Sequence, residues 1–201
     1  MCKCSNNIYK YTDSGLHHEC GVLGIYGVPD AANLAYYGLH ALQHRGQQGC
    51  GIVSVDQEGE FHRFRGDGLV TEVFNESRLS KLQGSMAIGH VRYSNAKCKG
   101  TENIQPFLFH HNSGDFAMAN NGQIVNYVQL RNELEDRGSL FQSSSDAEVI
   151  AHLIKKQGTD KILPRIHSLK EALNLIDGAF AFVIMTARRI YACRDKYGFH
   201  P

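Results

Sequence analysis

The stretch AFAFVIMT, residues 179–186, contains seven apolar residues and no charged one. A strand that covers a core with one face alternates apolar and polar residues, whereas this stretch places apolar side chains on both faces. The sheet that contains it therefore needs a covering layer on each side. The segment RIYACRD, residues 189–195, follows after a tight turn and is expected to be the next strand.

Further strand-like segments recur through residues 21–120. They are residues 21–27, 51–55, 61–65, 86–94, 106–111 and 116–120. One helix interrupts them, because residues 30–45 carry apolar side chains at helical spacing and Asp30 is available as an N-cap.

Three helical segments precede the last two strands. They span residues 126–138, where Gly138 is a C-cap signal, 143–158 and 160–178. Strands, then helices, then strands again is not the alternation of a doubly wound parallel sheet. Two sheets packed face to face, with helices outside, satisfy both this order and the two apolar faces of 179–186. The sequence therefore predicts an α+β fold, a four-layer αββα sandwich.

The composition excludes several classes of function. The chain has 201 residues, 42% of them hydrophobic, and a formal net charge of +1, so nothing indicates binding to nucleic acid or to an anionic membrane. No segment has the character of a secretory signal or a membrane span, which favours a cytoplasmic, reducing compartment. The six cysteines form no C-x-x-C pair. Cys2 and Cys4 could contribute to a metal site, but reduced surface thiols are the better interpretation.

Five polar features fit a purely structural role poorly. They are LQHRGQQGCG (42–51), GHVRYSNA (89–96), ANNGQI (119–124), SSSDAE (143–148) and Cys20. Each has a structural explanation when taken singly. Asn121-Gly122 is a hairpin-turn signal, Ser-Ser-Asp is an ordinary helix cap, and a cysteine in an apolar strand is usually inert packing.

The order of six motifs decides between these explanations and a functional site. They are Cys-Gly-Val-x-Gly-Ile, Gln-His-Arg-Gly-Gln, Gly-His-Val-Arg-Tyr, Glu-Asn-x-Gln-Pro-Phe, Asn-Gly and Ser-Ser-Asp-x-Glu. In this order they resemble the class II glutamine amidotransferase domain. QHRGQ and ENIQPF favour the amidophosphoribosyltransferase family over glucosamine-6-phosphate synthase and asparagine synthetase. The resemblance covers Glu19 to Pro201 and implies an αββα sandwich of the N-terminal-nucleophile hydrolase type.

The resemblance also implies that residues 1–19 are a leader, cut off between Glu19 and Cys20, and that residues 20–201 are the glutaminase domain. A thiol with a pKa of about 8.5 needs a base at neutral pH, and an α-amino group with a pKa of about 8 can act as one. Cleavage therefore supplies the nucleophile and its base on Cys20. The chain with an intact Glu19–Cys20 amide is expected to be inactive.

The remaining site residues are assigned by the same resemblance. Asn121 and the Gly122 N–H would stabilise the oxyanion, Arg92 would bind the α-carboxylate of glutamine, Asp146 would bind its α-ammonium group, and Arg45 and Gly46 would line the wall near the nucleophile. Residues 93–102 would form a lid. Asn95 and Asn120 depart from the family pattern, which commonly has threonine and histidine there, but neither departure removes an assigned residue.

The implied activity is hydrolysis of L-glutamine through a Cys20 thioester, which supplies ammonia for 5-phosphoribosylamine formation in purine synthesis. Phosphoribosylpyrophosphate would bind only through a C-terminal domain that this chain does not contain. No cofactor or metal is expected in this chain; Mg²⁺ and an iron–sulfur cluster would belong to the C-terminal part of a full-length, homo-oligomeric relative. The alternative is a non-catalytic or stand-alone glutamine-binding module that retains its leader.

Overall fold

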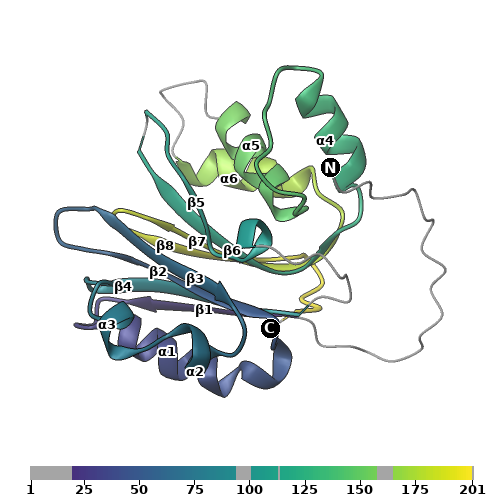
Figure 1. Ribbon diagram of the computed structural model, residues 1–201. Coiled ribbons are helices and arrows are strands. Elements are labelled where there is room, and N and C mark those ends of the chain that lie inside the picture. The colour runs from purple at the N-terminus through teal and green to yellow at the C-terminus, as the bar shows by residue number, and fades with distance from the viewer. Residues whose placement is uncertain (1–19, 94–100, 113, 158–164, 201) are drawn as a thin grey trace.

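The computed structural model describes residues 20–93, 101–112, 114–157 and 165–200. In these ranges two antiparallel sheets lie face to face between two layers of helices (Figure 1). This is the predicted four-layer αββα sandwich, and the α+β fold class is confirmed. The expected leader, residues 1–19, lies outside the described residues. Within the described part, no helix is long and apolar enough to cross a membrane.

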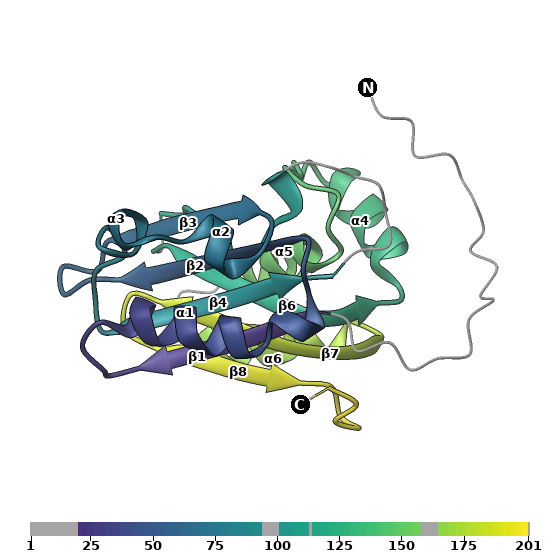
Figure 2. The same cartoon turned by 60° about the horizontal axis from the view of Figure 1, so that its bottom comes forward.

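The first sheet has the strand order β1-β4-β2-β3. Its strands are β1 (Gly21–Tyr26), β2 (Gly49–Val55), β3 (Phe61–Asp67) and β4 (Met86–Arg92). Helix α1 (Ala31–Ala41) crosses its outer face (Figure 2), and η1 (Gln43–Arg45), α2 (Val70–Val73) and α3 (Glu76–Leu79) complete this helical layer. Helix α1 packs closely on β4 because residue 89 is glycine: a Cβ there would lie 2.9 Å from the Leu39 side chain.

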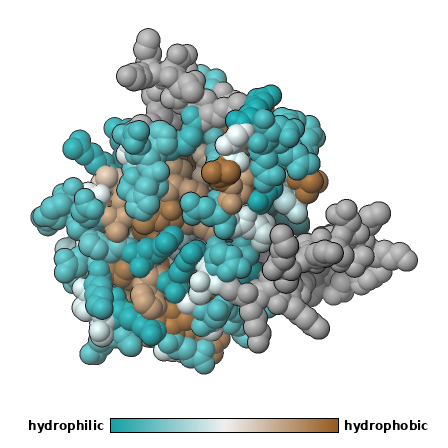
Figure 3. Space-filling model, turned by 45° about the horizontal axis from the view of Figure 1, so that its top comes forward, coloured by the Kyte–Doolittle hydropathy of each residue, from teal (hydrophilic) through white to brown (hydrophobic). Residues whose placement is uncertain are grey.

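The second sheet has the strand order β5-β6-β7-β8. Its strands are β5 (Phe107–Phe109), β6 (Phe116–Ile124), β7 (Gly178–Thr186) and β8 (Ile190–Arg194). The short η2 (Thr101–Asn103) precedes β5, and helices α4 (Tyr127–Glu135), α5 (Ala147–Gln157) and α6 (Arg165–Asn174) cover the outer face. Seen toward this face, hydrophilic side chains predominate and hydrophobic ones are exposed in smaller groups (Figure 3).

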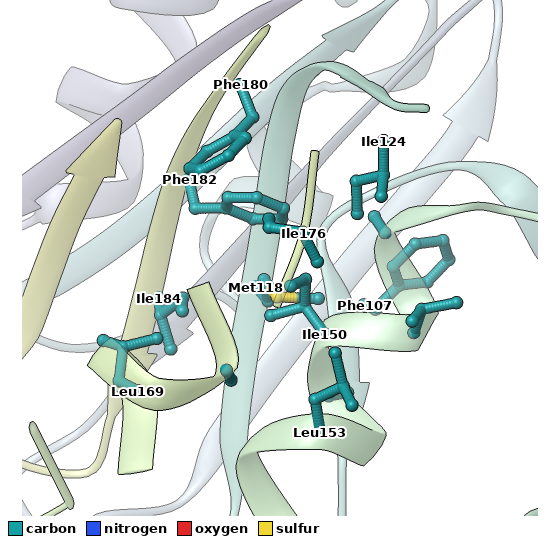
Figure 4. Packing of buried hydrophobic residues seen from close by; sticks show 14 of the residues in the cluster. Phe107, Met118, Ile124, Ile150, Leu153, Leu169, Ile176, Phe180, Phe182 and Ile184 are labelled. Atoms are coloured by element: carbon teal, nitrogen blue, oxygen red, sulfur yellow. The ribbon is translucent and has the colours of Figure 1, made fainter. Parts of the chain in front are cut away.

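Strand β7 has two apolar faces, as its sequence predicts. Phe180, Phe182 and Ile184 point toward the helices (Figure 4), whereas Val183 and Met185 point toward the first sheet. Full burial of side chains of this size stabilises a fold by about 1.5–3 kcal/mol each, so β7 holds both layers. The helix-side cluster labelled in Figure 4 also contains Phe107, Met118, Ile124, Ile150, Leu153, Leu169 and Ile176.

Asn121 and Gly122 lie inside strand β6 and not in a hairpin turn. They pair with Ala181 and Phe180 of β7. Gly122 has a φ of +119°, and a Cβ on it would lie 2.1 Å from the carbonyl oxygen of Ala179. Glycine is therefore required by the close approach of β7, and the hairpin explanation of this dipeptide is wrong.

Helix ends agree with the sequence in part. Gly138 ends α4 with a φ of +89°, and the next N–H donates to the Leu134 carbonyl at 2.9 Å. Asp30 occupies the N-cap position of α1 but has a left-handed backbone, and its side chain makes no capping hydrogen bond. The helix predicted over 160–178 is described only from residue 165.

Candidate active site

The layer between the sheets becomes polar toward one end. Side chains alternate along a strand, so every second residue of β1, β4 and β6 faces this layer. The apolar residues that do so are Val22, Met86, Ile88, Ala117 and Ala119. The polar ones, toward one end, are Cys20 just before β1, His90 and Arg92 on β4, and Asn121 on β6. Two contacts show that the polar positions share one end. Gly21 pairs with Val91 across β1 and β4, and His90 of β4 contacts Asn120 of β6.

Cys20 precedes β1 and lies against the end of β4. Its Sγ is 3.4 Å from the N–H of Tyr93 and 3.7 Å from the Tyr93 carbonyl oxygen. The Arg45 Nε donates to the Cys20 carbonyl at 2.8 Å. Cys20 is half-buried and not in a disulfide.

The QHRGQ segment packs on the same strand end. A Cβ on Gly46 would lie 2.6 Å from the backbone carbon of Arg92, so only glycine permits this approach. The Gln43 side chain fixes the segment by donating to the Gly46 carbonyl at 2.5 Å and accepting the Val70 N–H at 2.6 Å. Cys20, Arg45, Gly46 and Arg92 are thereby brought together, as the sequence predicts.

The second half of the site is the edge of β6. Strand β5 pairs with β6 only as far as Phe107 opposite Met118, so the following N–H groups on that edge have no strand partner there. The Asn120 N–H donates to Gln105 Oε1 at 2.6 Å, and the Ile124 N–H donates to Asp146 Oδ2 at 2.7 Å. In an antiparallel ladder, alternate N–H groups point the same way, so the Gly122 N–H lies on this edge between the two.

Two carboxylates near the start of α5, Asp146 just before the helix and Glu148 in its first turn, have pKa values shifted in opposite directions. Burial raises the pKa of Asp146, and the Ile124 N–H offsets this only in part. Burial also opposes the charge on Glu148, but hydrogen bonds from His152, the Gln142 N–H and Ser143 outweigh it and lower the pKa of Glu148 to about 2. Glu148 is thus fully hydrogen-bonded inside the protein, whereas the hydrogen bonds of Asp146 do not outweigh its burial.

The loop that carries Asp146 is also fixed to the segment before β5. Asn103 Nδ2 donates to Ser144 Oγ at 3.0 Å, and Asn103 Oδ1 accepts the Ser144 N–H at 3.1 Å. Asn103 and Gln105 both belong to the ENIQPF motif. This motif therefore contacts the Asp146 loop with one side chain and β6 with another.

Some expected site residues lie outside the described part of the chain. Glu19 is one of them, and so are Asn95 and residues 94–100 of the expected lid. Sequence reasoning assigned no role to His90 or Gln105, although both stand in quoted motifs. His90 contacts β6 from the other sheet, and Gln105 contacts β6 from the segment before β5. Contacts between such distant segments cannot be predicted from a local sequence pattern.

Two surface hollows lie at the other end of the sandwich. One, of about 460 Å³, includes Thr186 and Arg189, and the other, of about 380 Å³, includes Tyr26 and Arg189. Tyr26 and Thr186 end strands whose opposite ends lie near Cys20 and Gly122, so these hollows are remote from the candidate site. Among the described residues, no cluster of three or more His, Cys, Asp or Glu side chains could hold a metal ion.

Comparison with known proteins agrees with this geometry. A model of the glutamine amidotransferase domain family matches residues 90–201. The chain belongs to this family. The amidophosphoribosyltransferase of Bacillus subtilis (strain 168) is 50% identical over 188 residues, which cover 93% of this chain and 39% of that protein. That of Lacticaseibacillus casei is 48% identical over 188 residues, which cover 93% of this chain and 95% of that protein.

A solved structure supports the same membership. Glutamine phosphoribosylpyrophosphate amidotransferase from B. subtilis, complexed with ADP and GMP, matches with a TM-score of 0.82 and 46% identity, covering 90% of this chain and 38% of that chain. The predicted resemblance to amidophosphoribosyltransferases is confirmed. The chain spans 39% of the length of the B. subtilis relative, and the roles of individual site residues stay predictions.

Proposed function

We propose that this glutamine amidotransferase domain hydrolyses the side-chain amide of L-glutamine, with Cys20 as the nucleophile. The observation that carries the proposal is the position of Cys20 and Arg92 at neighbouring strand ends of the first sheet, with Asn121 on β6 of the second sheet, at one end of the inter-sheet layer. A thiol, a guanidinium and an amide would thus lie at the polar end of the layer, beyond the apolar cluster that fills the rest of it.

Cleavage between Glu19 and Cys20 would activate the site. In the uncleaved chain Cys20 has a φ of +61°, a left-handed conformation that costs a non-glycine residue about 1–2 kcal/mol. Cutting the preceding amide removes this strain and converts the Cys20 nitrogen into an amine. The Arg45 contact with the Cys20 carbonyl would hold the new N-terminus in place.

The reaction then proceeds in two stages. The Cys20 amine takes the thiol proton as sulfur attacks the carboxamide carbon of glutamine, and the resulting ammonium group returns a proton to the departing nitrogen. Ammonia leaves, and a γ-glutamyl thioester remains on Cys20. Water attacks the thioester carbon, its proton passes through the amine to the thiolate, and glutamate is released.

The edge of β6 suits the developing oxyanion. Asn121 faces the layer that holds Cys20, and the Gly122 N–H points from the edge that β5 leaves open. Such donors are fixed before the reaction and stabilise charge that appears only in the transition state. Removal of one donor of this kind costs about 10²- to 10³-fold in kcat.

Two charged residues would bind the amino-acid end of glutamine. The Asp146 carboxylate is bound to the Ile124 N–H, two residues beyond Gly122, which places it roughly 7 Å along the strand from the oxyanion donor. It would pair with the α-ammonium group. Arg92, on the facing strand, would bind the α-carboxylate through two parallel hydrogen bonds.

In the intact protein, we propose, the ammonia is used to form 5-phosphoribosylamine from phosphoribosylpyrophosphate. The relatives named as amidophosphoribosyltransferases support this. The acceptor site, with Mg²⁺ and an iron–sulfur cluster where a relative holds one, would lie in further sequence. We propose that the intact protein is a cytoplasmic, homo-oligomeric enzyme.

The experiment compares two forms of the protein, one beginning at Met1 and one expressed with Cys20 directly after a removable initiator methionine. Intact mass gives the N-terminus, 6-diazo-5-oxo-L-norleucine tests labelling of Cys20, and a coupled assay measures glutamate. The form that begins at Cys20 is expected to be labelled once and to release glutamate. If that form neither reacts with the label nor hydrolyses glutamine, the non-catalytic glutamine-binding module replaces this proposal.

A further inference from the structure

Asn120 stands beside the oxyanion pair, and two long-range contacts fix its backbone. The β5–β6 register, continued past Phe107 opposite Met118, would place residue 105 opposite residue 120. Strand β5 begins at Phe107, and the side chain of Gln105 takes the place of the missing ladder bond. Gln105 is 8% exposed, and its Oε1 accepts the Asn120 N–H at 2.6 Å.

His90 fixes the other backbone group of the same residue from the opposite sheet. Its Nε2 is 3.1 Å from the Asn120 carbonyl oxygen, and the ring is 1% exposed. A carbonyl oxygen only accepts, so Nε2 carries the proton. Burial lowers the pKa of His90 to about 3, which leaves the ring neutral at physiological pH. The bond joins β4, two residues before Arg92, to β6, one residue before Asn121.

We propose that Gln105 and His90 are positioning residues for the oxyanion-binding pair. Both backbone groups of Asn120 are held, and its own Nδ2 donates to the Gly122 carbonyl at 3.3 Å, so the segment that carries Asn121 and Gly122 is fixed at three points. This role rests on the proposed glutaminase activity. Donors aimed at a transition state are effective only if preorganised, so their loosening lowers kcat more than substrate affinity.

The test uses the protein that begins at Cys20 and removes each hydrogen bond in turn. Gln105→Leu and His90→Leu are expected to lower kcat, per Cys20 labelled, by about 10- to 100-fold. The KM for glutamine should change by less than about threefold. His90→Gln keeps an N–H near the position of Nε2 and is expected to recover most of kcat. Gln105→Asn, with a shorter acceptor, should be intermediate.

A second readout separates positioning from general loosening. The second readout uses the aldehyde that corresponds to glutamine, L-glutamate γ-semialdehyde. The Cys20 sulfur adds to its carbonyl carbon, and the thiol proton passes to the aldehyde oxygen. This oxygen then occupies the oxyanion position. The affinity for the aldehyde should fall about as much as kcat in the leucine variants, whereas the affinity for glutamate should not. Equal losses for both ligands would overturn the proposal.

Ser54→Ala is the matched control, because Ser54 is a fully buried polar residue of β2 in the same sheet as His90. Its kcat should equal that of the wild type. If the leucine variants do not fold, His90→Gln and Gln105→Asn carry the test. A wild-type protein that is neither labelled nor active refutes the glutaminase proposal itself. An active wild type with leucine variants of unchanged kcat refutes only the positioning role.

Discussion

The layer between the two sheets has an apolar half and a polar half, although the same strands run through both. Strand β4 contributes Met86 and Ile88 to the first and His90 and Arg92 to the second. Strand β6 changes in the same way, from alanines to Asn121. The two halves share the same strands and the same register, so their difference lies in the side chains.

The polar side chains stabilise the fold less than apolar side chains at the same positions would. Nδ1 of His90 and Oδ1 of Asn121 are buried and have no hydrogen-bond partner in the described part of the chain. Each such atom costs about 1–3 kcal/mol. A sandwich built for stability alone would carry apolar residues here, so we expect the polar half to serve function. Substitutions in the two halves should therefore separate activity from stability.

The largest effect is expected for Cys20→Ala, which removes the nucleophile. Glutamate release should fall by about 10³-fold or more, while the melting temperature stays close to that of the wild type. Cys50→Ala is the control, because burial raises the pKa of Cys50 to about 12 and its thiol stays protonated. The control should keep wild-type kcat. If the Cys20→Ala protein were still active, the polar half would not be the active site.

Asn121→Ala should give the next largest effect. We expect kcat to fall about 10²- to 10³-fold with little change in the binding of glutamate, because the lost donor acts on the oxyanion. Steady-state kinetics and calorimetric titration with glutamate measure the two quantities. Gln123→Ala provides the comparison, since Gln123 lies on the same face of β6 but is exposed. Equal losses in both variants would contradict an oxyanion role for Asn121.

Asp146→Asn should raise the KM for glutamine by about 10- to 100-fold, because the α-ammonium group loses its partner. The wild type should show a pH effect with a definite sign. As the pH falls through the raised pKa of Asp146, the carboxyl becomes neutral and KM rises. This rise should begin at a higher pH than an ordinary aspartate would allow, and the variant should lack it. A pH-independent wild-type KM would exclude this assignment.

Much of this arrangement was predictable from local pattern. Residues 179–186 revealed two covered faces, because the alternation of a strand is a local property. The order of the polar motifs placed Cys20, Arg92 and Asp146 in one site through their resemblance to a known family. Both inferences depend on residues close in sequence or on motif order.

The rest depended on contacts between distant segments. Asn121-Gly122 has the composition of a turn, and only its pairing with β7 keeps it in a strand. Helices α2 and α3 have four residues each, too few for an apolar period to be visible. The Asn75 cap, which accepts the Arg78 N–H at 2.9 Å, was the available signal for α3. His90 acquires its role only when the second sheet lies over the first.

Glu148→Gln tests a buried polar group whose bonds are all internal. Its folded pKa of about 2 lies below the ordinary value of 4.5, so its charge stabilises the fold above about pH 4.5, and this contribution is lost as the pH falls toward 2. We expect the variant to lose about 2–3 kcal/mol of unfolding free energy at pH 7, and the difference from the wild type to shrink below pH 4.5. Urea unfolding across this range measures it, with the exposed Glu133→Gln as control.

The smallest effect is expected in the apolar half. Ile88→Val removes one methylene group from a fully buried side chain in the same strand as His90 and Arg92. The free energy of unfolding should fall by about 1 kcal/mol, and kcat per labelled Cys20 should not change, because the cavity lies among side chains that only hold the sheets together. Urea unfolding and steady-state kinetics on one preparation give both numbers. A tenfold loss of kcat would show that packing in the apolar half sets the geometry of the polar half, and the division between the two would no longer hold.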